Sequence, residues 1–260
     1  MRRVFRACSI SSITVTICTF RIGLWRGTAM PARADEFALG IVVALQAEAV
    51  ALSRARIDDR AVVVAGIGCR RAQNAAARTL QRGARALVSF GVCGGLSPRL
   101  RRGDLLLPRR IVSDLGEWCT HDAWRARLLC ALPDAQEIDV LYSSAAPVSS
   151  VEEKHTLFAR NCEAVDMESA GVAQAAQRAG VPFFVVKAVC DPASRTVPAI
   201  ATRLLHRDGR LHWHAAVAAV FSGPHTWREL RALRDDFVAA RAGLKRAAQA
   251  LPRAAEGFAP

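Results

Sequence analysis

The sequence is poor in aromatic residues and in lysine. Aromatic side chains make up 6% of its 260 residues, and only three of its 36 basic residues are lysine. It contains no zinc-finger spacing and no stretch in which basic and aromatic residues alternate, so we exclude nucleic acid as a partner. The formal net charge of +13 leaves two interpretations, solvated arginine-rich faces or attraction to phosphate groups and anionic membranes.

The chain also lacks paired cysteines and long apolar runs. None of its eight cysteines forms a Cys-x-x-Cys pair, and several lie in apolar stretches, where cysteine acts as a small hydrophobic residue. This pattern is typical of a reduced, cytoplasmic protein. No run is long and apolar enough to predict a transmembrane helix.

The first thirty residues differ from the rest of the chain. They hold five arginines and no acid, and their middle is only moderately apolar and lacks an Ala-x-Ala cleavage site. We interpret residues 1–30 as a non-native or disordered leader. The expected domain is 31–250, followed by a flexible tail at 251–260.

Short apolar runs alternate with helical stretches over the remaining chain. Continuous apolar runs are typical of strands that helices cover on both faces. The runs that predict strands are 39–45, 61–65, 86–90, 103–108, 138–142, 164–166 and 182–189. Helices are expected at 47–56, 70–81, 151–160 and 169–179, with two more after residue 209. This order predicts one α/β domain, a central sheet with helices on both faces.

The last predicted helix places apolar residues along one side. They are Trp227, Leu230, Leu233, Phe237 and Leu244. We expect this side to pack against the sheet. The alternative is that the helix lies on a membrane surface, where Arg231, Arg234 and Arg241 would contact anionic headgroups.

Glycines follow the predicted strand 86–90 directly. In Gly91-Val92-Cys93-Gly94-Gly95, the missing side chains would let backbone N–H groups approach a ligand closely. A tight turn between a strand and a helix explains the same residues equally well. The spacing is not Gly-x-Gly-x-x-Gly, so it does not by itself predict a dinucleotide.

Acidic residues follow three other predicted strands, at the positions where open α/β sheets bind ligands. Asp166-Met167-Glu168 could bind a ribose diol, or could simply be acids at a helix start, where the dipole favours them. Asp191 could be desolvated and donate a proton to a leaving group, or could begin a turn with Pro192. Glu48 could orient a water molecule, or be a first-turn acid.

Together and in this order, these features resemble the nucleoside phosphorylase superfamily, in particular the branch of methylthioadenosine/S-adenosylhomocysteine nucleosidases. The resemblance spans about residues 39–220 and implies a mixed central sheet. It rests on 41–48, Gly66-Ile67-Gly68, 90–96, Gly103-Asp104-Leu105, Val165-Asp166-Met167-Glu168 and 185–191.

The resemblance implies a role for each of these residues. Glu168 would bind the ribose 2′- and 3′-hydroxyls, with Met167 packed under the sugar. Asp191 would hydrogen-bond the purine and help to protonate N7, and Glu48 would activate water. The chemistry needs no metal and no organic cofactor. The residues that would line the ribose or phosphate pocket are Gly91, Val92, Cys93 and Gly94.

Two departures from the family pattern bear on the reaction. Phosphorolytic relatives bind phosphate with an Arg and a Ser, where this chain has Ser89 and Val92. Phosphate would then need Arg70 or Arg71 at a helix start, although an exposed helix face explains these arginines too. Hydrolytic relatives stack an aromatic residue on adenine, and residues 143–148 contain none, which would leave room for a bulky apolar substituent. The attacking group, water or phosphate, stays open.

Three segments are similar to the hopanoid-associated phosphorylases, or adenosylhopane nucleosidases. They are Asp191-Pro192-Ala193-Ser194-Arg195-Thr196-Val197-Pro198, Asp208-Gly209 and Trp227-Arg228-Glu229-Leu230. This similarity implies adenine release from adenosylhopane in hopanoid side-chain biosynthesis, with peripheral membrane contact. The expected partners are a purine nucleoside, phosphate if the reaction is phosphorolytic, and further copies of the chain in a homo-oligomer. The alternatives are a soluble substrate such as methylthioadenosine or S-adenosylhomocysteine, or a non-catalytic nucleoside-binding module.

Overall fold

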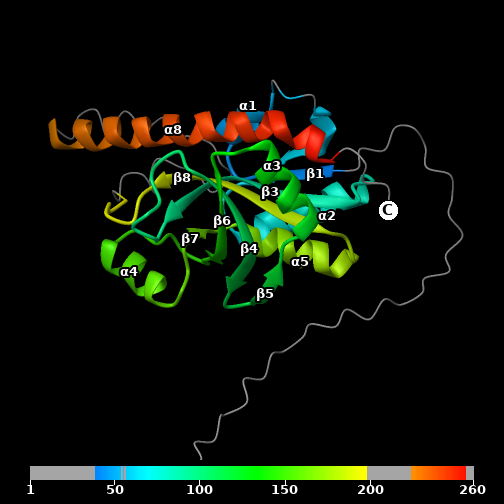
Figure 1. Ribbon diagram of the computed structural model, residues 1–260, viewed down its shortest axis with the longest axis horizontal. Coiled ribbons are helices and arrows are strands. Elements are labelled where there is room, and N and C mark those ends of the chain that lie inside the picture. The colour runs from blue at the N-terminus through cyan, green and yellow to red at the C-terminus, as the bar shows by residue number, and fades with distance from the viewer. Residues whose placement is uncertain (1–38, 54, 56, 198–223, 256–260) are drawn as a thin grey trace, which may run out of the picture. The chain divides into compact units, whose positions relative to one another are not determined.

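The computed structural model describes residues 39–53, 55, 57–197 and 224–255. The expected leader, residues 1–30, lies outside these ranges, as do residues 198–223, where the first helix after residue 209 was expected. Within the described ranges, each helix is too short or too polar to serve as a membrane span. The described residues form one sheet with helices on both faces, as predicted (Figure 1).

Eight strands form the sheet, in the order β2-β1-β3-β7-β6-β4-β5, and β8 pairs with both β3 and β4. Because β8 runs parallel to β3 but antiparallel to β4, the sheet is mixed, which confirms the predicted fold class. The strands are β1 (Leu39–Val43), β2 (Val62–Val64), β3 (Ala86–Gly95), β4 (Leu105–Ser113), β5 (Gly116–Cys119), β6 (Ala135–Ser143), β7 (Ala164–Asp166) and β8 (Phe183–Asp191).

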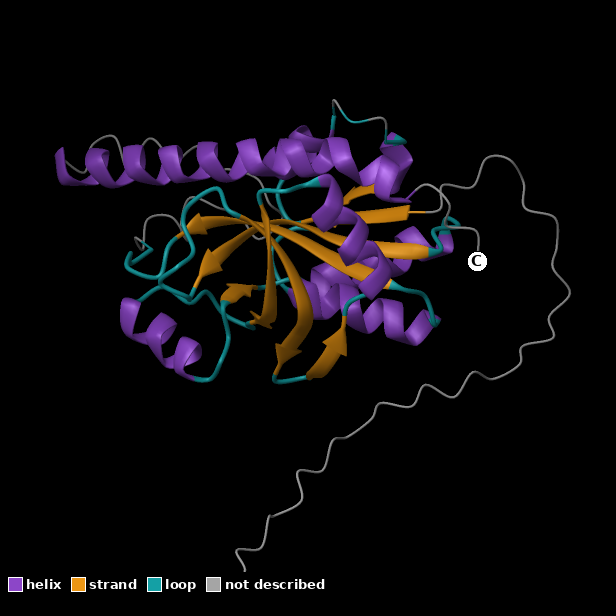
Figure 2. Cartoon of the chain, in the orientation of Figure 1, coloured by secondary structure: helices purple, strands orange, loops and turns teal. Residues whose placement is uncertain are grey.

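Helices cover both faces of the sheet (Figure 2). One core contains apolar residues of α1 (Gln46–Leu52), α3 (Asp122–Ala131) and α8 (Pro224–Ala255), and the other contains those of α2 (Cys69–Gln81) and α5 (Ser169–Ala179). Successive residues of a strand point to opposite faces, so Val88 packs into the first core and Leu87 into the second. Burial on both faces explains why these strands are continuous apolar runs.

A third, smaller cluster lies under α4 (Val151–Ala159). Leu157 of this helix packs with Tyr142 of β6 and Val165 of β7. Ser150 caps the helix by accepting a hydrogen bond from the Glu153 N–H, and the Glu153 carboxylate accepts one from the Ser150 N–H in return. This capping fixes the residue at which α4 begins.

The glycine-rich segment belongs to a strand, so the expected loop at Gly91–Gly95 is wrong. β3 continues through Gly95, since neighbouring strands offer hydrogen-bond partners on both sides. Gly94 pairs with Val165 of β7, and Gly91 pairs with Lys187 of β8. The register with β8 shifts between Cys93 and Gly94, a bulge-type irregularity that changes the direction of the strand.

A second difference lies at the far edge of the sheet. β4 runs unbroken from Leu105 to Ser113, and β5 pairs antiparallel with it, where no strand was predicted. Three of the four β5 residues are exposed, so the hairpin has no apolar run to reveal it. Only Trp118 of β5 is buried, in the core that α2 and α5 share.

Helix α8 packs against the sheet along its C-terminal half, as predicted. Ala240, Leu244 and Ala247 are fully buried, and α8 also contacts α1 and α3 (Figure 1). Arg231 and Arg234 on the same helix are exposed. The first five residues of the expected tail, 251–255, are helical and Leu251 is buried, because the apolar side continues into them. Residues 256–260 lie outside the described ranges.

Close packing of α2 on α5 requires a glycine at position 171. A Cβ there would lie 2.1 Å from the Cys69 carbonyl oxygen, which belongs to backbone and cannot rotate away. We expect Gly171→Ala to lower the free energy of unfolding by about 1–3 kcal/mol through overpacking, although alanine favours helices. Gln249→Ala, which places the same side chain on the exposed side of α8, is the matched control and should change it by less than about 0.5 kcal/mol. Urea denaturation of both variants measures this, and equal stability of the two would contradict the packing argument.

Candidate active site

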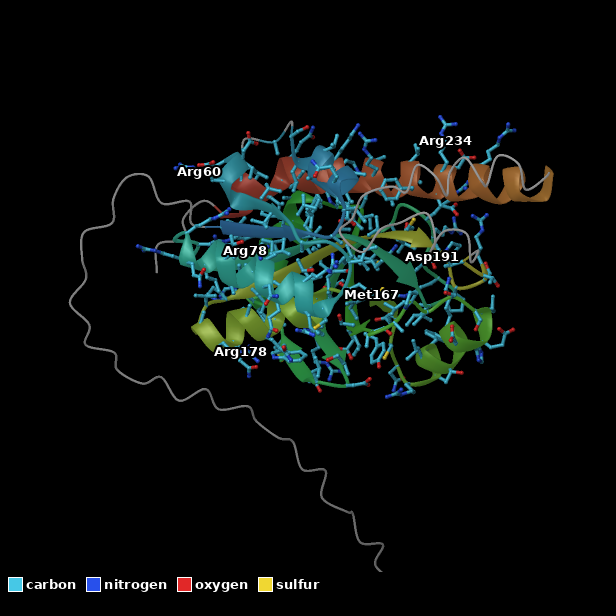
Figure 3. All side chains as sticks on the ribbon, turned by 180° about the vertical axis from the view of Figure 1, so that it is seen from behind. Arg60, Arg78, Met167, Arg178, Asp191 and Arg234 are labelled. Atoms are coloured by element: carbon cyan, nitrogen blue, oxygen red, sulfur yellow. The ribbon has the colours of Figure 1, made fainter. Side chains whose placement is uncertain are left out.

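The predicted acids come from elements that surround β3. Glu48 lies in the first turn of α1 just after β1, Glu168 lies between β7 and α5, and Asp191 ends β8. β3 pairs with β1, β7 and β8, and its segment Gly91–Gly95 passes close to Glu48 and Asp191. Figure 3 marks Met167 and Asp191 of this site.

Backbone N–H groups hold the Glu48 carboxylate. Its Oε2 accepts hydrogen bonds from Ala44 N at 2.9 Å and Leu45 N at 2.8 Å, and its Oε1 accepts one from Val92 N at 2.8 Å. Gly91 is required for this approach, because a Cβ there would lie 2.5 Å from Oε1. Burial raises the pKa of Glu48, while the positive charge of Lys187 and the three N–H groups oppose the shift.

The Glu168 carboxylate lies at the start of another helix, α2. Its Oε1 accepts a hydrogen bond from Gly68 N at 2.9 Å, and its Oε2 accepts a weaker one from Met167 N at 3.3 Å. Burial raises the pKa of Glu168 to about 7; the carboxylates of Asp166 and Glu48 add to the rise, and Lys187 opposes it. When it is ionised, the Glu168 carboxylate can accept further hydrogen bonds from a neutral ligand such as a diol.

A buried ammonium lies among these carboxylates. Lys187 of β8 is 2% exposed, and its Nζ lies 2.8 Å from Asp166 Oδ2. Burial alone would lower the pKa of Lys187, but the carboxylates of Asp166, Glu168 and Glu48 together raise it, so the ammonium keeps its proton. The Asp166 carboxylate also accepts a hydrogen bond from Ser169 Oγ at 2.5 Å. Lys187 thus forms an ion pair with Asp166, and its charge also acts on the buried carboxylates of Glu168 and Glu48.

A second buried lysine contacts Asp191. Lys154 of α4 is 0% exposed, and its Nζ lies 2.5 Å from Asp191 Oδ2. Burial raises the pKa of Asp191, and the charge of Lys154 opposes this rise. Gly94 of β3 leaves room for the carboxylate, since a Cβ there would lie 3.2 Å from the same Oδ2.

The remaining predicted site residues fall into two groups. Val92 and Met167 are partly exposed at the cluster, whereas Cys93 is buried and burial raises the pKa of its thiol well above the usual range. The residues expected to bind phosphate do not gather. Arg70 and Arg71 are exposed on the first turn of α2, and the buried Ser89 hydroxyl is hydrogen-bonded to Ser169 Oγ at 3.0 Å.

Sequence reasoning assigned no role to Lys154 or Lys187, although one signal was available. The chain has 36 basic residues and uses arginine for all but three of them. Two of the three lysines are the fully buried ones that contact Asp191 and Asp166, and the third, Lys245, is exposed. In this arginine-rich chain, two of the three lysines therefore occupy buried positions where a compact ammonium is paired with a carboxylate.

The fold and the sequence both have known relatives. The model of the phosphorylase superfamily matches residues 39–128 and 137–221. The chain is similar to the 5′-methylthioadenosine/S-adenosylhomocysteine nucleosidase of Neisseria meningitidis, with a TM-score of 0.61, 16% identity, and coverage of 83% of this chain and 98% of that one. It is also similar to the nucleosidase of Helicobacter pylori, with a TM-score of 0.61, 19% identity, and coverage of 85% of this chain and 98% of that one. The futalosine hydrolase of Helicobacter pylori is similar with a TM-score of 0.58, 19% identity, and coverage of 80% of this chain and 96% of that one.

No curated protein sequence matches the chain at a significant level. At these identities the solved structures share the fold with the chain, and the family assignment comes from the match to the family model. That match extends over well over half of the chain and includes Glu48, Glu168, Lys187 and Asp191. The chain belongs to the phosphorylase superfamily, as the sequence motifs predicted.

Proposed function

We propose that this protein hydrolyses the N-glycosidic bond of a purine nucleoside. The observation that carries the proposal is the placement of Glu48 and Glu168 around one buried cation, with Asp191 at the neighbouring strand end. The solved structures of similar fold support it, since their names describe nucleosidases and a futalosine hydrolase.

The proposed roles follow from where charge develops in the reaction. When the bond breaks, its electron pair goes to the purine and the ribose becomes cation-like. Asp191 gives its proton to the purine nitrogen, while Glu168 holds the ribose hydroxyls and its negative charge favours the cationic sugar. Water then adds its oxygen to C1′ and gives a proton to Glu48. Exchange with solvent returns both acids to their starting states.

The charge of the buried cluster favours water over phosphate as the attacking group. Three carboxylates and one ammonium would repel a phosphate dianion entering beside the ribose. The helix start that could bind phosphate is also occupied, because the Gly68 N–H already donates to Glu168. Arg70 and Arg71 point their charge into solvent at the first turn of α2, and we propose no phosphate contact for them or for Ser89.

For the substrate, we propose an adenine nucleoside with a bulky apolar substituent, adenosylhopane being the first choice. The family resemblance around Asp191 supports this choice, as do the small, exposed residues Ala145, Ala146 and Pro147 beside the site. The exposed Arg231 and Arg234 of α8 are consistent with contact to an anionic membrane that holds such a substrate. Methylthioadenosine is the soluble alternative, which the names of the similar structures favour.

Adenine release with and without phosphate tests the reaction and the substrate together. The purified protein is incubated with adenosylhopane in detergent micelles or with methylthioadenosine, and adenine is followed by chromatography. We expect release in phosphate-free buffer, with no acceleration by added phosphate, and faster cleavage of adenosylhopane. A strict requirement for phosphate would overturn hydrolysis, and release from methylthioadenosine alone would overturn the choice of substrate.

Replacing the proposed acid tests its role. Asp191→Asn keeps the shape of the side chain but has no proton to transfer, so we expect kcat to fall by roughly 10²–10⁴-fold while the circular dichroism spectrum is unchanged. Asp139→Asn, which changes an exposed aspartate of β6, is the matched control and should keep wild-type activity. Full adenine release by the Asp191→Asn protein would rule out this assignment.

The pH dependence of kcat/KM should be bell-shaped. The mechanism needs Glu48 ionised and Asp191 protonated, and burial raises the pKa of both groups. Activity falls at low pH when Glu48 takes up a proton, and it falls at high pH when Asp191 loses its proton. In the residual activity of Glu48→Gln, we expect the low-pH limb of the profile to be absent. In that of Asp191→Asn, we expect the high-pH limb to be absent. A profile that keeps both limbs in either variant would contradict the roles.

A further inference from the structure

Lys154 uses all three of its N–H donors at one place. Its Nζ donates to Asp191 Oδ2 at 2.5 Å, to the Pro192 carbonyl oxygen at 3.0 Å and to the Arg195 carbonyl oxygen at 2.8 Å. The side chain reaches these acceptors from α4, a different element, and water does not reach it. One ammonium therefore ties the carboxylate at the end of β8 to the turn that follows it.

The choice of lysine is itself informative. Burying a charge costs free energy unless the charge is paired and hydrogen-bonded. The buried ammonium of Lys154 is therefore stable only because of the acceptors that surround it. Arginine, which the chain prefers elsewhere, carries a planar guanidinium with donors in a fixed fork. Three acceptors around one nitrogen suit the compact ammonium, whose donors point in three directions.

These contacts distinguish the two oxygens of the Asp191 carboxylate. Lys154 donates to Oδ2, so Oδ1 is the oxygen without a hydrogen bond to the ammonium. Among the described residues, the other charged or titratable groups that interact with Asp191 are Asp236 of α8 and the thiols of Cys190 and of Cys93 on β3. Asp236 is buried and forms ion pairs with Arg102 and Arg195. In the part of the chain that the structure describes, the cation in direct contact with Asp191 is Lys154.

We propose that Lys154 is a positioning residue for Asp191. It aims Oδ1 at the purine, and it stabilises the carboxylate that remains after Asp191 has given its proton to the purine nitrogen. Lys154 keeps its own proton throughout, so the atoms and charges of the reaction are unchanged by its presence. The inference rests on the proposed function, because it acts through the proton that Asp191 transfers.

A double-mutant cycle tests the proposal. The proteins are the wild type, Lys154→Met, Asp191→Asn and the double variant, with Lys245→Met, an exposed lysine of α8, as the matched control. The probe is whichever of methylthioadenosine and adenosylhopane the wild type cleaves faster. We expect Lys154→Met to lower kcat by roughly 10–100-fold with a smaller change in KM, because a misplaced acid mainly slows chemistry. In the Asp191→Asn background, the same change should lower kcat no further.

The pH dependence of kcat/KM distinguishes the positioning role of Lys154 from a purely structural one. Without the ammonium, the Asp191 carboxylate loses its nearby cation, so the limb that Asp191→Asn abolishes should move to higher pH in Lys154→Met. Lys154→Gln keeps N–H donors without charge and should move the same limb in the same direction, which covers the case in which Lys154→Met does not fold.

The outcomes distinguish the two proposals. A limb that stays in place in both Lys154 variants, or equal fold losses from Lys154→Met in the wild-type and Asp191→Asn backgrounds, would overturn the positioning role. Wild-type activity in Asp191→Asn would instead overturn the proposed function, whatever Lys154 does. Loss of activity in Lys245→Met equal to that in Lys154→Met would also reject the inference, since the effect would not be specific to the buried lysine.

Discussion

The buried ammonium of Lys187 is the interaction on which the candidate site depends. Asp166, Glu168 and Glu48 all act on this cation, and its charge opposes the rise in pKa that burial causes at Glu168 and Glu48. The ammonium is fixed because β8 pairs with β3 on one side and with β4 on the other, close to Lys187. The pairing of strands in the mixed sheet therefore sets the position of the Lys187 ammonium among the carboxylates.

The glycines of β3 are the second constraint. A strand that runs beside buried acids must leave room for their side chains, and Gly91 and Gly94 do so for Glu48 and Asp191. The same strand supplies the Val92 N–H to Glu48. The glycines thus let the carboxylates approach β3 closely. The Val92 N–H that binds Glu48 is held in place because β3 is paired with its neighbouring strands.

The distribution of charge separates the surface from the site. The formal net charge of the chain is +13, and Arg70, Arg71, Arg231 and Arg234 are exposed. The buried cluster, by contrast, holds more carboxylates than cations. A basic surface attracts anionic molecules or membranes over a distance of about 8–10 Å at physiological salt. In the proposed reaction, the acidic interior would favour the cation-like sugar, whereas the basic surface would act only on the approach of a ligand.

The sequence by itself determined the types of most elements and the candidate acids. Apolar runs predicted β1, β7 and β8 to within two residues, and Glu48, Glu168 and Asp191 lie where strand ends predicted them. Only the tertiary structure decided that Gly91–Gly95 continues β3, and that the two buried lysines pair with Asp166 and Asp191. The physical reason is that the contacts of the site join residues far apart in the chain. Lys154 and Asp191 are separated by 37 positions, and Gly68 and Glu168 by 100. Local patterns specify which face of an element is apolar, whereas strand pairing and helix packing specify which charges meet.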